Sequence, residues 1–159
     1  MRALRRMEEA WRLPLLACAL VLPQVASAQS WSNCNINTAP PIVFGVYNPL
    51  LYGDLVAQSS IAITCVGLGA ARINMLAGLG GGGITARAMQ RGAARLPYQL
   101  YRDSARTQVW GDGTAGTSVA TLGVFIFANQ TFPVYARILQ RQDVPVGLYT
   151  DTVQVRVDF

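Results

Sequence analysis

The chain has 159 residues, a length that suits one domain, and a formal net charge of +5. It contains no Lys or His, and both of its Glu residues, Glu8 and Glu9, lie near the N-terminus. This composition argues against most acid–base, nucleophilic and zinc chemistry, because those sites depend on His, Glu or an activated thiol. Well-separated Arg residues also give little support for nucleic-acid binding.

Residues 1–28 predict a cleaved secretory signal peptide. Four Arg within the first twelve residues make a basic start, and an apolar stretch over 13–22 follows. The string ASA at 26–28 is the small-x-small pattern that a signal peptidase recognises, so we expect cleavage after Ala28. The apolar stretch is too short to span a bilayer stably. We therefore expect an exported domain over 29–159, without stable membrane insertion.

Two cysteines remain in that domain, Cys34 and Cys65. An even cysteine count in an exported chain suggests a disulfide, and two cysteines allow one pairing. The bond would close a loop of about 31 residues and stabilise the fold by roughly 3–4 kcal/mol in the chain-entropy model. Two free buried thiols are the alternative, which an oxidising compartment disfavours.

In chain order, the domain consists of short apolar or alternating segments separated by Gly, Pro, Asn and Asp. The strands predicted from them cover residues 41–47, 60–66, 72–77, 96–102, 107–110, 119–128, 131–140 and 153–159. Many short strands with turn signals between them are typical of an all-β sandwich. Only residues 85–94 show a competing, weak helical pattern.

Two glycine-containing stretches resemble ligand motifs, but loops explain them better. Gly78, Gly80 and Gly83 fit G-x-G-x-x-G. A dinucleotide site, however, needs a βαβ unit, which the strand pattern does not contain. The WGDG string at 110–113 supplies one carboxylate, Asp112, which is too few for calcium and suits a tight Asp-Gly turn. We expect no cofactor and no metal site.

The chain ends in a strongly alternating segment. Val153, Val155, Val157 and Phe159 are apolar, and the residues between them are polar. A period of two predicts a strand with one buried face and one solvated face. This strand either pairs wholly within a complete sandwich or forms one wall of a groove that a partner strand fills. Periodicity alone does not separate these alternatives.

Taken in order, several strings resemble the spore coat protein U domain family. They are FGVYNPL at 44–50, the strand ending in Cys65, RAM at 87–89, LPYQLYRD at 96–103, WGDG at 110–113, FPVYARI at 132–138 and GLYTDTV at 147–153. The resemblance covers nearly all of residues 34–159. The two cysteines, the Tyr-x-Leu-Tyr-x-Asp string and the Gly-x-Tyr-x-Asp string are together fairly specific, although each alone is weak.

The resemblance implies a fold and a function. That family includes secreted pilins of the archaic chaperone–usher pathway, which are tied to adhesion and biofilm formation. Such pilins resemble an immunoglobulin-like β-sandwich that lacks its last strand. A periplasmic chaperone first fills the gap, and a donor strand of the next subunit replaces it by β-strand addition.

The resemblance therefore predicts a structural pilus subunit, exported through the periplasm to the cell surface. Its expected partners are a periplasmic pilus chaperone, an outer-membrane usher and other pilin subunits. Val153, Val155, Val157 and Phe159 would line the donor-strand groove and contact the chaperone. Only residues 29–33 precede Cys34 after the expected cleavage, so whether this arm can itself donate a strand is left open.

Two other functions compete with this interpretation. One is a non-polymerising secreted coat, matrix or carbohydrate-binding sandwich, in which aromatic residues could stack on sugars. The candidates for such stacking are Tyr98, Tyr101, Trp110 and Tyr135. The other is a periplasmic enzyme, which the missing His and Glu disfavour, so we expect a protein that is not an enzyme.

Overall fold

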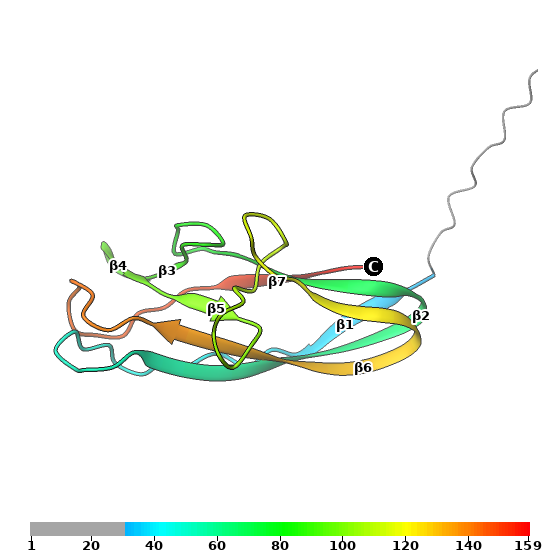
Figure 1. Cartoon of the computed structure of the whole chain (residues 1–159), viewed down its shortest axis with the longest axis horizontal. Helices are drawn as coiled ribbons and strands as arrows, with labels where there is room; N and C mark the ends of the chain where they lie inside the picture. The colour runs from blue at the N-terminus through cyan, green and yellow to red at the C-terminus, as the bar shows by residue number, and fades with distance from the viewer. Residues whose placement is uncertain (1–30) are drawn as a thin grey trace, which may run out of the picture.

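The computed structural model describes residues 31–159, so the predicted signal peptide lies outside the described residues. This part is all-β, as expected, and contains no helix (Figure 1). It therefore offers no helical segment that could cross a membrane. The strands are β1 (Asn33–Thr38), β2 (Leu55–Gly78), β3 (Ala88–Arg91), β4 (Ala94–Pro97), β5 (Gln99–Tyr101), β6 (Ala120–Ile138) and β7 (Val153–Asp158).

Two long strands, β2 and β6, form the frame of the molecule. They pair antiparallel from Leu55↔Ile138 to Ile73↔Ala120. Register shifts interrupt this ladder between Val66 and Ala71, and both strands bend there (Figure 1). Irregular pairing of this kind bends a sheet, so each strand contributes one part to each layer of the fold.

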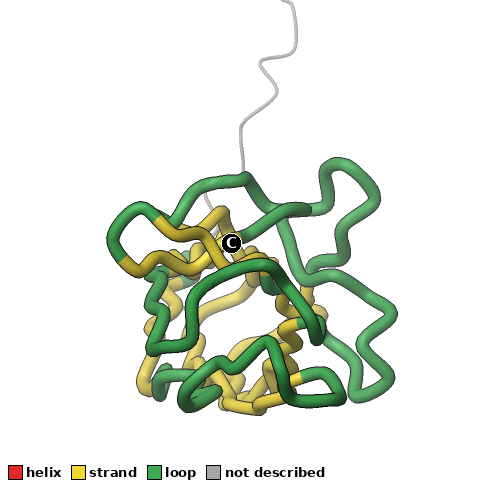
Figure 2. Tube along the Cα trace, turned by 90° about the vertical axis from the view of Figure 1, so that its left-hand side faces the viewer, coloured by secondary structure: helices red, strands yellow, loops and turns green. Residues whose placement is uncertain are grey.

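The two parts of β2 have different partners along one edge. β1 pairs with the part that contains Cys65, and β7 pairs with the part from Arg72 to Gly78. β5 lies on the far side of β6, and β3 and β4 form a separate hairpin. Figure 2 views the molecule end-on and shows the loops that connect its layers at this end. The result is an immunoglobulin-like β-sandwich whose sheets are not closed.

The bend explains one difference from the predicted strands. Residues 60–66 and 72–77, expected as separate strands, are the two parts of β2. Residues 119–128 and 131–140 likewise fall almost entirely within β6. Short-range periodicity cannot tell a bent strand from two strands, because the turn-forming residues at the bend look like a connection.

Four further segments differ from the prediction. Residues 41–47 join no strand and form only the isolated bridge between Tyr47 and Gly147, and residues 107–110 likewise form only isolated bridges. Residues 85–94 contribute β3 and the start of β4 rather than a helix, with a positive φ of 60° at Gly92 in the turn between these strands. β1 was not predicted because three of its six residues are Asn, which is depleted in strands, although Cys34 and Ile36 alternate with them.

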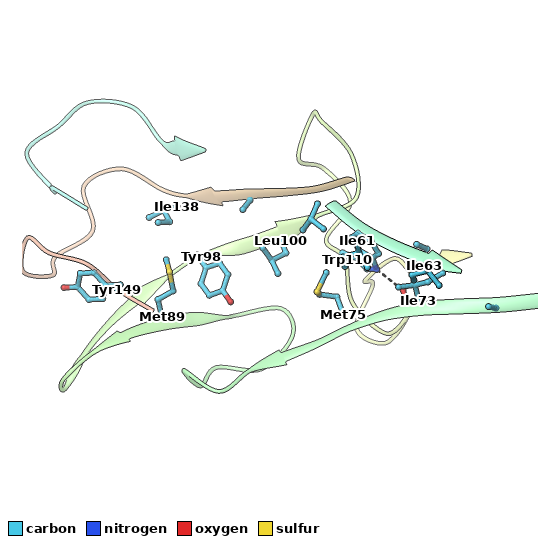
Figure 3. Packing of buried hydrophobic residues seen from close by; sticks show 14 of the residues in the cluster. Ile61, Ile63, Ile73, Met75, Met89, Tyr98, Leu100, Trp110, Ile138 and Tyr149 are labelled. Atoms are coloured by element: carbon cyan, nitrogen blue, oxygen red, sulfur yellow. Dashed lines mark hydrogen bonds between the residues drawn. The ribbon is translucent and has the colours of Figure 1, made fainter. Parts of the chain in front are cut away.

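The core lies between the two layers and is built from aliphatic and aromatic side chains (Figure 3). Ile63, Ile73 and Leu96 are fully buried. Trp110, which is 1% exposed, donates its Nε1–H to the carbonyl oxygen of Ile73 at 2.9 Å. A buried indole with a satisfied N–H fills the core without leaving an unpaired donor. Trp110 is therefore a core residue and not a surface platform for sugars.

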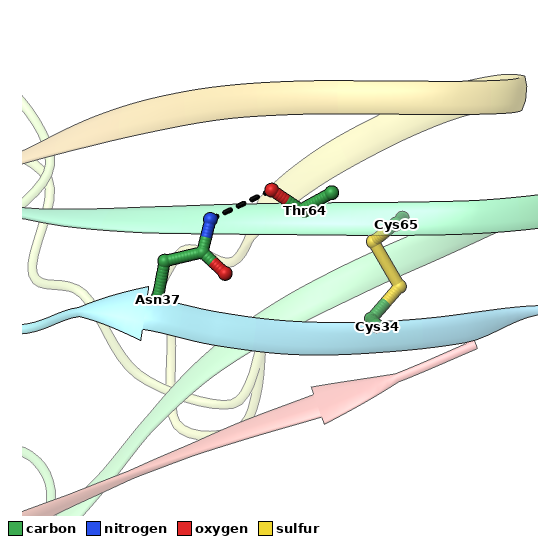
Figure 4. Close-up of a disulfide and its surroundings, with 4 residues drawn as sticks. All are labelled: Cys34, Asn37, Thr64 and Cys65. Carbon is green, nitrogen blue, oxygen red and sulfur yellow. Dashed lines mark hydrogen bonds between the residues drawn. A yellow bond between two sulfur atoms is a disulfide. The ribbon is translucent and has the colours of Figure 1, made fainter.

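The predicted disulfide between Cys34 and Cys65 is present and joins β1 to β2 (Figure 4). Its Cα atoms are 4.1 Å apart. The two residues face each other in the β1–β2 ladder. Asn37 adds a second side-chain link by donating its Nδ2–H to Thr64 Oγ1 at 2.6 Å. The edge strand β1 is thus held covalently as well as by its ladder.

Candidate functional site

An apolar groove of about 470 Å³ lies between residues 39–45 and the segment that leads into β7. Its floor is the side of the core that faces the groove. This floor includes Ile61, Leu100 and Val134, whose side chains are at most 3% accessible to solvent. These three residues come from β2, β5 and β6. The groove is therefore a gap over a packed apolar floor, located where the sandwich lacks a strand.

One wall of the groove, β7, has an unused main-chain edge. Met75 faces Val155 in the β2–β7 ladder, but its N–H donates to Gly111 O at 3.1 Å and its carbonyl accepts from Arg87. Met75 therefore makes no main-chain hydrogen bond to Val155, and this is a non-hydrogen-bonded pair. In such a pair the N–H and C=O of Val155 point away from β2. Within the described residues no strand pairs with this second edge of β7.

The opposite wall, residues 39–45, also lacks strand partners. Pro40 and Pro41 have no amide hydrogen to give to a ladder. Ile42 and Phe44 nevertheless pack against the core. The wall thus places apolar side chains over the interior while its backbone stays outside the sheets.

The two walls meet at one end of the groove. Tyr47 and Gly147 exchange main-chain hydrogen bonds, with N···O distances of 2.9 and 3.1 Å. A Cβ at Gly147 would lie 2.6 Å from the guanidinium of Arg91, so a side chain here would require Arg91 to move aside. From this bridge the walls diverge and leave space between them.

Asp151 anchors the segment that enters β7. Its carboxylate accepts hydrogen bonds from the Tyr98 hydroxyl at 2.6 Å and from the Gly80 amide at 2.7 Å. Burial, and then the hydrogen bond to Asp151, raise the pKa of Tyr98 well above its ordinary value. The phenol therefore stays protonated and remains a donor at physiological pH. This contact also accounts for one glycine of the G-x-G-x-x-G match, because a Cβ at Gly78 would collide with the Asp151 carboxylate.

Arg87 is fully buried and stabilises the strands and loop beneath the groove. Its guanidinium donates to the carbonyl oxygens of Met75 and Trp110, at 2.8 and 2.9 Å, and also to Leu76 O and Gln99 Oε1. Burial lowers its pKa to about 10, so it remains charged at neutral pH. Arg87 satisfies carbonyl groups that the sheet leaves unpaired where β2, β5 and the loop after β5 come together.

The structure separates the four residues predicted to line the groove. Val153 and Val155 line it. Val157 packs against the core but is not among the lining residues, and Phe159, 50% exposed, is in neither group. The alternation correctly predicted which side chains of β7 face inward. It could not predict where along the strand the groove ends.

The sequence of the chain matches a known family. The chain matches the Spore Coat Protein U domain over residues 20–156. The chain belongs to this family. It is 34% identical over 128 residues to "Protein U" of Myxococcus xanthus, an alignment that covers 73% of this chain and 70% of that protein.

A solved structure connects the Spore Coat Protein U domain fold to pilus subunits. The chain superimposes, with a TM-score of 0.59 and 25% identity, on a chain in the CsuC–CsuE chaperone–tip adhesion subunit pre-assembly complex from the archaic chaperone–usher Csu pili of Acinetobacter baumannii. The match covers 80% of this chain and 40% of that chain. The fold is therefore that of chaperone–usher pilus subunits, a structural class rather than a class of enzymes.

Several residues that shape the groove were not identified as site residues from the sequence. Tyr98 and Asp151 lie in strings typical of the Spore Coat Protein U domain family, but their contact joins positions 53 residues apart. Arg87 also lies in such a string, RAM at 87–89, but its acceptors belong to three separate segments. The sequence of residues 39–45 did indicate an irregular segment. Two prolines next to an apolar run are typical of a segment that cannot form all the main-chain hydrogen bonds of a sheet.

Proposed function

We propose that this protein is a structural pilus subunit of a chaperone–usher system, assembled by donor-strand complementation. The observation that carries the proposal is the open edge of β7 beside an apolar groove. An added strand would pair with Val153, Val155 and Val157 through the main chain and place alternate side chains on the groove floor. An exposed strand edge with an apolar face is otherwise an aggregation hazard, so a partner that covers it has a clear physical role.

The partners follow from this mode of assembly. A periplasmic chaperone would fill the groove first, an outer-membrane usher would recruit the complex, and another pilin subunit would then supply the permanent strand. This route also requires export through the periplasm and a final location at the cell surface. In this proposal the subunit contributes to surface adhesion and biofilm formation as part of the assembled pilus.

Co-expression with a chaperone tests the proposal directly. The exported protein, produced alone in a bacterial periplasm, should aggregate, be degraded or self-associate. With a cognate chaperone it should be recovered as a soluble one-to-one complex. A stable, soluble monomer obtained without any partner would contradict the proposal, because it would mean that the groove needs no strand.

A non-polymerising coat or matrix protein is the second candidate, favoured by the name of the family. In that case the exported protein would be soluble or surface-bound without a chaperone, and no chaperone complex would form. Adhesion is tested separately. Deleting the gene should reduce attachment and biofilm mass, and restoring the wild-type gene should recover both.

A further inference from the structure

The strand β1 lies at an open edge of the fold. It pairs with β2 on one side, and within the described residues no strand pairs with its other side. Cys34 faces Cys65 with a Cα–Cα distance of 4.1 Å, which is typical of a non-hydrogen-bonded antiparallel pair. The N–H and C=O of Cys34 therefore point away from β2. The same holds for Ile36, two residues further along this ladder, so the free edge offers a donor and an acceptor at each of these positions.

The outer strands β4, β5 and β7 differ from β1 in how their edges are protected. β4 carries Arg95 and Pro97, and charged residues and prolines both hinder pairing of an edge with a further strand. The loop after β5 covers the edge of that strand through the bridge between Tyr101 and Val109. β7 borders the groove in which a donor strand is proposed to bind. β1 contains neither a charged residue nor a proline, so its edge has none of these protections.

The side chains of β1 alternate between two faces. Cys34 and Ile36 lie on the inner face, opposite buried residues of β2. The three Asn residues of β1 are exposed, and the hydrogen bond from Asn37 to Thr64 runs along the outer face (Figure 4). Asn is depleted in strands, so a row of three on one strand calls for a specific explanation.

This row of Asn residues is complementary to itself. Two β1 strands can pair antiparallel with Asn35 of one copy opposite Asn35 of the other. Asn33 of each copy then faces Asn37 of the other copy. In the same register Cys34 faces Ile36, and their outward N–H and C=O groups meet as hydrogen-bonded pairs. An Asn side chain is both donor and acceptor, so facing Asn residues can bond to each other across the junction.

The surroundings of β1 carry no formal charge. The sequence has no charged residue between Arg12 and Asp54 or between Asp54 and Arg72, so β1 and the part of β2 that pairs with it are uncharged. Residues 120–136 of β6 are uncharged as well. Two copies of a positively charged chain can therefore bring this edge together without local charge repulsion.

We propose that the free edge of β1 binds the β1 edge of a second copy of this chain, antiparallel and about a twofold axis at Asn35. The layers that contain β1 then form one continuous sheet across both copies, and this isologous contact closes as a pair. No residue of β1 lines the groove, so the contact does not depend on a donor strand. In an assembled pilus it would join neighbouring filaments side by side, a consequence that rests on the proposed function. Repetition along the filaments would strengthen a contact that is weak as a single pair.

Light scattering over a range of protein concentrations measures the association. The sample is the soluble form of the exported protein, which is its chaperone complex or, where the protein is soluble alone, the free protein. The contact is small for an interface, so we expect a dissociation constant of about 0.01–0.3 mM and a mass that doubles through this range. A mass that stays constant up to about 1 mM would overturn the inference. Formation of the chaperone complex bears on the proposed function alone, so the two failures are distinguishable.

Charge substitutions at the twofold axis then identify the contact. Asn35→Lys should raise the dissociation constant about tenfold or more, because two like charges lie directly opposite each other. Asn35→Asp should have the same effect for the same reason. An equal mixture of the two variants should recover most of the association, since each mixed pair places Lys opposite Asp. Only a register in which residue 35 faces itself predicts this rescue.

The matched control is Asn129→Lys. Asn129 is exposed and lies in the same cross-strand row as Asn35, on the far side of Thr64. The same change of charge there is two strands from the edge, so it should alter the dissociation constant by less than about twofold. Circular dichroism should show that every variant keeps the wild-type fold. Undiminished association of Asn35→Lys, equal weakening by Asn129→Lys, or a mixture no better than its components would each overturn the inference.

Discussion

At the scale of single residues, a few polar side chains decide the shape of the groove. Asp151 and Tyr98 fix the segment entering β7, and Arg87 fixes the strands beneath it. Each is buried or half-buried and makes hydrogen bonds to groups distant in sequence. Such groups are costly to remove, because their partners are left unsatisfied in the interior.

Replacing Arg87 with Met should strongly destabilise the protein. The change leaves the carbonyl groups of Met75, Leu76 and Trp110 without their present donor, so we expect a loss of about 3–5 kcal/mol in the free energy of unfolding. Urea unfolding of the chaperone-bound or peptide-filled protein measures it. Arg95→Met, at an exposed site, is the control and should change stability by less than about 0.5 kcal/mol. A similar small effect at Arg87 would mean that water replaces its hydrogen bonds.

At the scale of elements, the two edges of β7 differ from each other, and so do its two faces. One edge is paired with β2, and the other is free. One face packs on the core, and the other is solvated. Each asymmetry gives a measurement in which neighbouring residues should behave differently.

Hydrogen exchange should alternate along β7. The amides of Val153, Val155 and Val157 point to the free edge and should exchange rapidly in the unfilled protein, whereas those of Gln154 and Arg156 should be protected by β2. Binding of a chaperone or a donor peptide should protect the first set and leave the second unchanged. Mass spectrometry or NMR resolves the two sets. Uniform protection before binding would show that the free edge is already paired.

Val155→Asp should disrupt the groove wall. The substitution places a charge without a partner over the apolar floor, a change that costs several kcal/mol when the site is closed by a strand. We expect little or no soluble chaperone complex in a pull-down from the periplasm. Gln154→Asp changes the neighbouring, outward-facing residue and should leave the complex intact. If both variants bound the chaperone equally, Val155 would not belong to the contact.

At the scale of the whole molecule, an incomplete sandwich is held together by two long bent strands and one covalent link. β2 and β6 run through both layers, so each layer is tied to the other by its own backbone. The disulfide adds a constraint at β1, which otherwise has a single neighbouring strand. These features keep the fold ordered although one strand position is empty.

Removing the disulfide should lower stability without changing the fold. A Cys34→Ser/Cys65→Ser variant should lose about 3–4 kcal/mol, because the unfolded chain regains the freedom of a loop closed over 31 positions. Denaturant unfolding of the partner-filled protein measures the loss. Thiol labelling of the denatured, unreduced wild-type domain should find no free thiol at Cys34 or Cys65. Two labelled thiols would contradict the disulfide.

The sequence by itself determined the fold class, the disulfide and the inward residues of the last strand. These depend on local periodicity and composition: Val153, Val155 and Val157 alternate with polar residues, and an exported domain with two cysteines has one pairing available. The family strings added the expectation of a missing strand, which period-two alternation alone could not provide.

Tertiary structure alone decided where the groove lies and which residues hold it. The bend that turns two predicted strands into β2, the failure of residues 41–47 to join a sheet, and the exclusion of Phe159 from the groove all depend on how distant segments pack. Arg87 and Asp151 act through acceptors and donors contributed by other strands and loops. Local sequence patterns record which face of a strand is apolar, but they do not record which segment lies opposite, and that pairing sets both ends of the groove.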